Sequence, residues 1–296
     1  TFSPDAEYPL VNTEKGRFPG HFTAGFEASD ALPRLVSIKA GTKVNVVPGK
    51  AKAAVEGFEM AALEKAAAET KEETGISFEF AAEGTVTEIT ATGIGAHAST
   101  PDVGNNALTG LLVFLGKLDF ASCPQVDMVR KTASLFPHGD VNGKTLGVAM
   151  EDELSGNLTL SFNMLSVDAA SMDGEFDGRI PVCGNDENVL EVVRARMAEQ
   201  GLTLLNKALI PPHHVSADSY FVKTLLAAFE LYTGRKGECQ ALGGGTYVHH
   251  LENGVAFGAA MPETDNKMHG PDEFAVVDEL LVSAKIFAQA IVDLCG

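Results

Sequence analysis

One order of predicted elements occurs twice between residues 15 and 211, and it constrains the fold more than any single motif does. Each time, alternating strand patterns flank a segment in which apolar residues recur at helical spacing. The halves share this order but no residue-level repeat, so we predict two α+β sandwich units in tandem. The first unit has strands within 22–47, an Ala-rich helix over 48–74 ending at Gly75, two more strands, and a buried helix over 104–118; the second has strands over 158–167, 174–182 and 202–210, with a helix over 185–200.

The segments on either side of this region are predicted to form one further α/β layer. Residues 1–14 are an extended piece that is too short to fold alone, so we expect them to add a strand to the C-terminal block. The predicted organisation is an α+β domain, 15–211, inserted between 1–14 and 212–296. The C-terminal block contains predicted helices over 218–233 and 275–294, a Gly-rich strand and turn over 240–247, and a strand over 253–258.

Composition and charge exclude several classes of protein. The 296 residues carry a formal net charge of −18, which argues against a nucleic-acid partner, because a phosphate backbone attracts basic surfaces. No apolar run approaches the roughly 20 residues that cross a bilayer, so we expect no membrane association. The four cysteines are scattered without a C-x-x-C pair, which favours reduced thiols and a cytoplasmic location.

Five motifs occur in a fixed order along the chain. They are Pro-Asp-Ala-Glu-Tyr-Pro (4–9), Glu-Lys-Gly (14–16), Gly-Ala-His-Ala-Ser-Thr-Pro (95–101), Gly-Gly-Gly-Thr-Tyr (243–247) and Met-His-Gly-Pro-Asp-Glu (268–273). Taken in this order, they resemble the PepV-like dipeptidases of the aminoacylase/ArgE/DapE superfamily of dizinc metallopeptidases. The resemblance implies an α/β catalytic domain with a phosphorylase/hydrolase-like mixed sheet, an inserted lid of two sandwich units, and zinc-dependent hydrolysis of dipeptides. It also implies a monomer.

The resemblance assigns two zinc ligands to this chain. Asp5 matches a terminal zinc-binding carboxylate, and His269 matches the C-terminal zinc-binding histidine on the other metal. Neutral imidazole and carboxylate groups are ordinary zinc ligands. Without the resemblance, Asp5 would be taken for a solvated turn aspartate and His269 for an exposed loop histidine.

His97 matches the family's oxyanion-stabilising histidine. Its glycine-rich turn permits a tight backbone path that could project the imidazole. Such a donor stabilises the oxygen that becomes negative when the peptide carbonyl is attacked. A doubled lid could bring this histidine to the site within one chain. The alternative is a structural turn histidine.

The resemblance also implies a set of substrate-binding residues. Arg179 and Asn45 match lid positions that hold the substrate, and a guanidinium can bind a carboxylate through two hydrogen bonds. Gly243, Gly244, Gly245 and Thr246 fit no nucleotide-binding spacing, but closely spaced glycine N–H groups can bind a carboxylate. Many relatives have Ala-Arg where this chain has Val-His after Tyr247, so roles for His249 and His250 stay open.

The superfamily's earlier H-x-D motif and catalytic Glu-Glu pair have no match in the expected place. His138-Gly139-Asp140 and Glu72-Glu73 look similar, but both fall within the predicted lid. Because catalytic zinc sites use about three protein ligands per metal, we expect a preceding segment to supply the others and this chain alone to be inactive. The alternatives are a non-catalytic peptide-binding or assembly homologue, or a related zinc deacylase.

Overall fold

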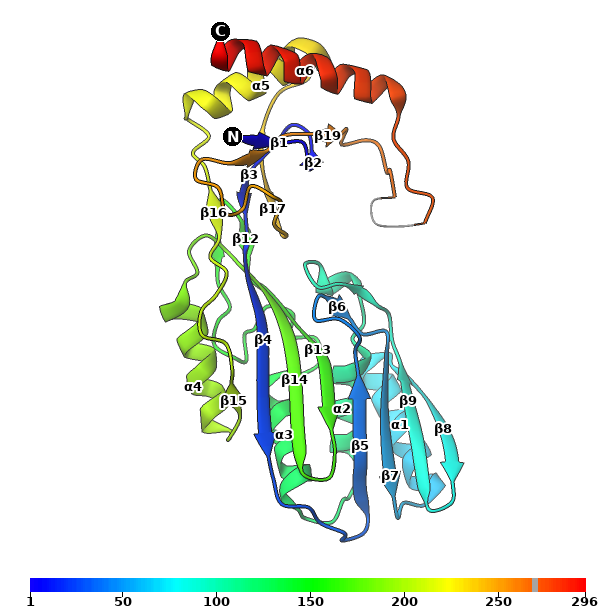
Figure 1. Cartoon of the computed structure of the whole chain (residues 1–296). Coiled ribbons are helices and arrows are strands. Elements are labelled where there is room, and N and C mark those ends of the chain that lie inside the picture. The colour runs from blue at the N-terminus through cyan, green and yellow to red at the C-terminus, as the bar shows by residue number, and fades with distance from the viewer. Residues whose placement is uncertain (268–270) are drawn as a thin grey trace.

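The computed structural model describes residues 1–267 and 271–296, which form two lobes (Figure 1). A lower lobe is built on one large sheet, and an upper lobe carries both termini and two long helices. The chain passes between the lobes twice, once after β3 and once before β16. Each lobe therefore has its own main β-sheet and its own layer of helices.

The lower lobe contains an eight-stranded sheet in which every neighbouring pair is antiparallel. Its two halves meet where β13 pairs with β5, so the predicted units share one continuous sheet. In spatial order the strands are β15 (Thr203–Leu204), β4 (Gly16–Gly25), β14 (Ser171–Ile180), β13 (Thr159–Val167), β5 (Arg34–Ala40), β7 (Lys50–Glu56), β9 (Val86–Thr92) and β8 (Ser77–Glu83).

Helices α1, α2 and α3 lie behind this sheet in Figure 1. α2 begins where the Asn106 side chain accepts hydrogen bonds from the N–H groups of Leu108 and Thr109, which satisfies otherwise unpaired donors. Its buried apolar residues join those of the strands in one core. The helical segments are α1 (Met60–Thr74), η1 (Pro101–Val103), α2 (Ala107–Gly116), α3 (Pro124–Leu135), η2 (Asp186–Leu190) and α4 (Glu191–Glu199).

The predicted helix over 48–74 is wrong in its first part. Residues 50–56 form strand β7, and Gly57, with φ of 84°, ends it before α1 begins. Ala51, Ala53 and Val55 are buried alternately, so the period is two, but alanine-rich composition hid it. The predicted strand over 202–210 also shrinks to β15, and α3 was not predicted.

The upper lobe has a mixed sheet: β1 and β17 pair in parallel with β18 and β3, whereas β16 and β18 run antiparallel to β3. Its core is aromatic, with the rings of Tyr8 and Phe257 5.2 Å apart. Helices α5 and α6 lie together above it (Figure 1). The elements are β1 (Phe2–Ser3), β2 (Ala6–Glu7), β3 (Leu10–Glu14), β16 (His213–His214), α5 (Tyr220–Thr233), β17 (Cys239–Leu242), β18 (Val255–Ala256), β19 (Ala259–Ala260) and α6 (Val277–Cys295).

The two crossings between the lobes are in direct contact. The N–H of Arg17 donates to the carbonyl of Ile210, and the N–H of Ile210 donates back to Arg17. A Cβ on Gly16 would lie 2.7 Å from the Ile210 carbonyl oxygen, so only glycine fits this approach. The connection is a pair of bonded antiparallel segments.

Two observations concern the chain as a whole. Among the described residues, no helix is long and apolar enough to cross a membrane. All four cysteines have free thiols, and Cys123 is buried. Cys183 and Cys295 are exposed, as separate single thiols on different lobes.

Candidate functional site

Three segments that are far apart in sequence meet where the lower lobe joins the upper one. Arg179, near the end of β14, donates through Nη1 to the carbonyl of Gly243, 2.8 Å away, just after β17. A Cβ on Gly243 would lie 3.2 Å from Cβ of Ser99, in the turn that follows His97. The structure therefore brings together the predicted residues Arg179, Gly243 and His97.

The guanidinium of Arg179 is buried among charged groups. Only 4% of Arg179 is exposed, and both Nε and Nη2 donate to the Asp177 carboxylate. Burial raises the pKa of Asp177 above its usual value, although Arg179 acts in the opposite direction. Burial lowers the pKa of Lys15; nearby Asp152 counters this, and the positive charge of Arg179 adds to it. Arg17 pairs with Arg179 across β4 and β14, and both cations act to lower the pKa of Asp177.

The hydrogen bonds of His97 indicate which ring nitrogen carries the proton. The backbone N–H of Ser99 donates to Nδ1 over 3.2 Å, and the Ser99 hydroxyl lies 2.6 Å from the same atom. Nδ1 is therefore an acceptor, which leaves the proton on Nε2. A neutral imidazole in this tautomer is a hydrogen-bond donor through Nε2.

A short antiparallel pair places Asn45 beside His97. β6 (Val46–Val47) pairs with β10 (Ala96–His97), and the N–H of Ala98 donates to the Asn45 carbonyl over 3.0 Å. Asn45 is half-buried and His97 is exposed. Two of the predicted lid residues are thus neighbours on one edge of the lower lobe.

The glycine-rich loop, Gly243 to Thr246, lies against Arg179 and is held at its far end. A Cβ on Gly244 would lie 3.9 Å from Nη1 of Arg179. Thr246 donates through its backbone N–H and its hydroxyl to the Glu14 carboxylate. Within the described part of the chain, the N–H groups of Gly244 and Gly245 donate no hydrogen bond. Unpaired donors beside a cation suit an anionic ligand.

The convergence of the two predicted zinc ligands falls outside the residues that the structure describes. Asp5 is exposed on the turn between β1 and β2, and His269 lies outside the described residues. In the ranges 1–267 and 271–296, no group of three or more His, Cys, Asp or Glu side chains could hold a metal ion. These side chains therefore do not make up the donor set of a catalytic zinc site.

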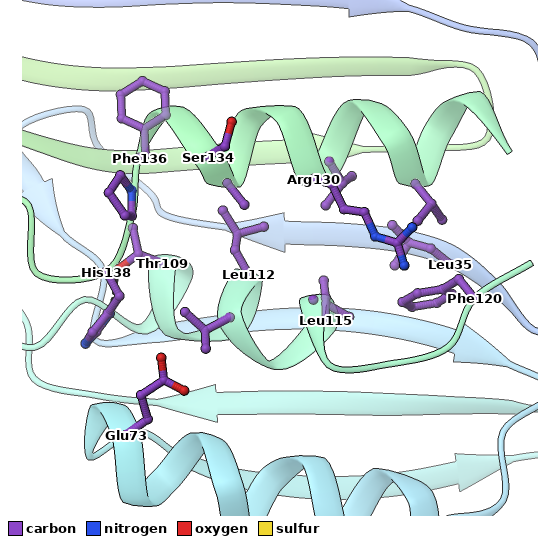
Figure 2. A pocket seen from close by; sticks show the side chains of 16 residues that line it. Leu35, Glu73, Thr109, Leu112, Leu115, Phe120, Arg130, Ser134, Phe136 and His138 are labelled. Atoms are coloured by element: carbon purple, nitrogen blue, oxygen red, sulfur yellow. Dashed lines mark hydrogen bonds between the residues drawn. The ribbon is translucent and has the colours of Figure 1, made fainter. Parts of the chain in front are cut away.

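The two motifs that mimic catalytic sequences have structural contacts. Nδ1 of His138 lies 2.9 Å from the Thr109 hydroxyl, and Asp140 accepts backbone N–H groups of its own loop. Glu73 is paired with Lys117 at 2.8 Å. His138 and Glu73 line one end of a cavity of about 400 Å³ between α2 and α3, which is otherwise mainly apolar (Figure 2).

Three charged residues at the junction were not predicted. Glu14, Asp177 and His249 are 1%, 4% and 6% exposed, and each is hydrogen-bonded to a predicted site residue or its neighbour. Asp177 stands two residues before Arg179, on the same face of a strand, and that spacing is a signal that could have suggested the pair. Glu14 and His249 meet only through the tertiary fold.

The overall architecture is shared with a solved dipeptidase. The aminoacylhistidine dipeptidase of Vibrio alginolyticus superposes with a TM-score of 0.52 over 99% of this chain and 64% of that protein, at 11% sequence identity. At this identity the comparison establishes the fold alone. The chain therefore has the fold of that protein, with mixed sheets and helices, as predicted.

Sequence comparison finds similarity to dipeptidases. The chain is 32% identical over 294 residues to the β-Ala-Xaa dipeptidase of Lactobacillus delbrueckii subsp. lactis, and 34% identical over 300 residues to YtjP of Bacillus subtilis, which is named as a dipeptidase. Each alignment covers 99% of this chain but only 62% and 63% of the relatives, so the chain spans less than two thirds of their length. No family model matches the sequence. The predicted resemblance to dipeptidases is confirmed over nearly all of this chain.

Proposed function

We propose that this chain is the lid and the C-terminal part of the catalytic domain of a dipeptidase, and that its own task is to hold the substrate. In this proposal residues 15–211 are the lid, and 1–14 with 212–296 belong to the catalytic domain. The observation that carries it is the contact of Arg179 with the glycine-rich loop beside His97. The substrate is a small unblocked peptide.

The C-terminal carboxylate of the dipeptide would lie between Arg179 and the N–H groups of Gly244 and Gly245. A guanidinium has five N–H donors, and Arg179 uses two on Asp177 and one on Gly243. Two donors remain for a ligand, and the glycine amides supply others. Lys15 and Arg17 add positive potential, which favours an anion at a buried site.

His97 would donate from Nε2 to the oxygen of the scissile peptide, and Asn45 would contact the same part of the substrate. The Ser99 contacts that make Nδ1 an acceptor support this role, because they leave the proton where a donor is needed. An oxyanion donor commonly contributes about 3 kcal/mol to the transition state. The proposed substrate contacts all come from one copy of this chain, so this part of the proposal requires no second copy.

The family's divalent metal, typically zinc, would supply the activated water. Asp5 and His269 are the proposed ligands in this chain, and the described side chains do not complete a donor set. We therefore expect the 296-residue chain to bind dipeptides without hydrolysing them. Hydrolysis of alanylalanine by this chain with added zinc, at a rate that depends on the metal, would contradict that expectation.

Calorimetric titration tests the proposed carboxylate site. The wild-type chain should bind alanylalanine more tightly than its C-terminal amide, and Arg179→Lys should weaken alanylalanine binding by roughly tenfold or more, because the lysine ammonium cannot reproduce the planar fork. Arg196→Lys, at an exposed position on α4, is the matched control and should bind like wild type. Equal affinities for acid and amide would refute the site.

The same titration separates the proposal from a purely structural homologue. An assembly module would bind neither ligand, and Arg179→Lys would then alter only stability. Binding and stability must both be measured for Arg179→Lys, because Arg179 is buried and is also the ion-pair partner of Asp177.

A further inference from the structure

His249 lies three residues after the glycine-rich loop, and the proposed substrate contacts do not include it. It is 6% exposed, whereas the adjacent His250 is exposed. Its Nδ1 lies 2.7 Å from Oε2 of Glu14, and its Nε2 lies 2.9 Å from the carbonyl oxygen of Pro211. Glu14 and Pro211 belong to the two different crossings between the lobes, so one imidazole ring joins both.

The Glu14 carboxylate joins this ring to the loop. Its second oxygen, Oε1, accepts the backbone N–H of Thr246 over 3.0 Å and the Thr246 hydroxyl over 2.6 Å. The backbone also contributes, because the N–H of Lys15 donates to the carbonyl of Leu242. A carboxylate that is 1% exposed would be costly without such partners. Here both of its oxygens are bound.

We propose that Glu14 and His249 are positioning residues that hold the glycine-rich loop against Arg179. The loop is anchored at both ends, at Gly243 by Arg179 and at Thr246 by Glu14. The amides of Gly244 and Gly245, which donate to no described residue, lie between the anchors. The inference rests on the proposed carboxylate site, because it explains how the donors of that site keep their geometry.

The contacts also limit where the protons of this network lie. The Pro211 carbonyl can only accept, so Nε2 of His249 carries a proton. The contact between Nδ1 and Glu14 holds one further proton, which the ring and the carboxyl group share as donor and acceptor. A Cβ on Gly245 would lie 3.2 Å from Nδ1, so a side chain there would crowd this bond.

Three variants of this chain distinguish the loss of the hydrogen bonds of His249 from a mere change of a histidine side chain. His249→Gln removes the ring and its bond to Glu14, whereas His250→Gln is the same substitution at the exposed neighbour. Glu14→Gln keeps an oxygen for Thr246, and its amide can donate to Nδ1, so the network survives with a neutral ring. NMR would follow the amide resonances of Gly243 to Thr246, hydrogen exchange at the Thr246 N–H, and the ring nitrogens of His249.

We expect His249→Gln to shift the loop resonances and to speed Thr246 exchange at least about tenfold, equivalent to about 1.4 kcal/mol. His250→Gln should change neither. Glu14→Gln should keep Thr246 exchange within about threefold of wild type, with the His249 ring protonated on Nε2 and accepting the glutamine amide at Nδ1. If His249→Gln fails to fold, the ring signal in Glu14→Gln still decides, because a ring that carries a proton on Nδ1 there overturns the pairing.

Titration with alanylalanine distinguishes this inference from the proposed function. His249→Gln should bind it roughly tenfold more weakly than His250→Gln does. Equal affinity, or loop resonances that do not move in His249→Gln, would overturn the positioning role. A loop that moves in His249→Gln while the wild-type chain binds no alanylalanine would uphold positioning and refute the carboxylate site.

Discussion

The core of the lower lobe and the junction between the lobes are equally buried, but by opposite chemistry. The core is filled by aromatic and aliphatic side chains such as Phe18, Phe22 and Phe176. The junction buries Glu14, Asp177, Arg179 and His249 instead. Apolar groups need only shape and volume, whereas buried charges need specific partners at specific atoms. The difference indicates which region holds the protein together and which is arranged for a ligand.

The largest effect should come from the apolar region. Phe176→Ala removes a fully buried ring that packs on Phe18 with centroids 4.9 Å apart, and should lower the free energy of unfolding by about 3–5 kcal/mol. Urea denaturation measures this. Leu154→Ala, at a residue 51% exposed, is the control and should stay within about 0.5 kcal/mol. A similar loss for both would mean that the core is not where the fold is stabilised.

A somewhat smaller loss is expected at the next residue along β14. Asp177→Asn leaves Arg179 buried without its counter-charge and should cost about 3 kcal/mol. It should also weaken binding of alanylalanine, because Arg179 loses its orientation. Asp173→Asn on the same strand removes an exposed contact to His21 and should cost less than about 1 kcal/mol. If urea denaturation showed equal losses of stability for Asp177→Asn and Asp173→Asn, the contrast between the buried and the exposed ion pair would be contradicted.

The crossing between the lobes should tolerate little added volume. Gly16→Ala would place a Cβ 2.7 Å from a carbonyl oxygen of the other crossing, and should cost about 2 kcal/mol. Gly116→Ala, at the end of α2, meets nothing within 4 Å and should be neutral or slightly stabilising. Thermal unfolding of the two variants compares them. A neutral Gly16→Ala would mean that the crossings are not in firm contact.

The smallest effect concerns acid stability. Burial acts to raise the pKa of Asp140, but hydrogen bonds from Thr145, Lys144 and Asn142 lower it overall. A carboxyl whose folded-state pKa is depressed stabilises the fold above its unfolded pKa, and this contribution is lost as the pH falls through the folded-state value. The free energy of unfolding of Asp140→Asn should therefore fall less steeply than that of the wild type as the pH is lowered below about 4. An unchanged acid profile would contradict this.

Most of the framework could be predicted from the sequence because it depends on periodicity. Alternation predicted strands close to β13 and β14, and helical spacing predicted segments close to α2, α5 and α6. Prediction failed at β7, where small alanines satisfy both periods, and at β15, where the strand is short. A local hydrophobic pattern distinguishes a strand from a helix only when the side chains are large enough to make the buried face differ from the exposed face.

The site was predictable only in part. Motif resemblance predicted His97, Arg179, Asn45 and the glycine-rich loop as site residues, but their contacts in three dimensions were not visible in the sequence. Glu14 and His249 are separated by 235 residues, so no spacing rule could pair them. The convergence of Asp5 with His269 stays a prediction, because His269 lies outside the described residues.

The most direct test of the account is a map of backbone amide shifts as alanylalanine saturates the wild-type chain. The largest changes should fall on the loop from Gly243 to Thr246 and on Ser99, and they should shrink when the peptide's carboxylate is replaced by an amide. Changes confined to the cavity between α2 and α3, or equal changes with acid and amide, would contradict the claim that the junction holds the substrate's carboxylate.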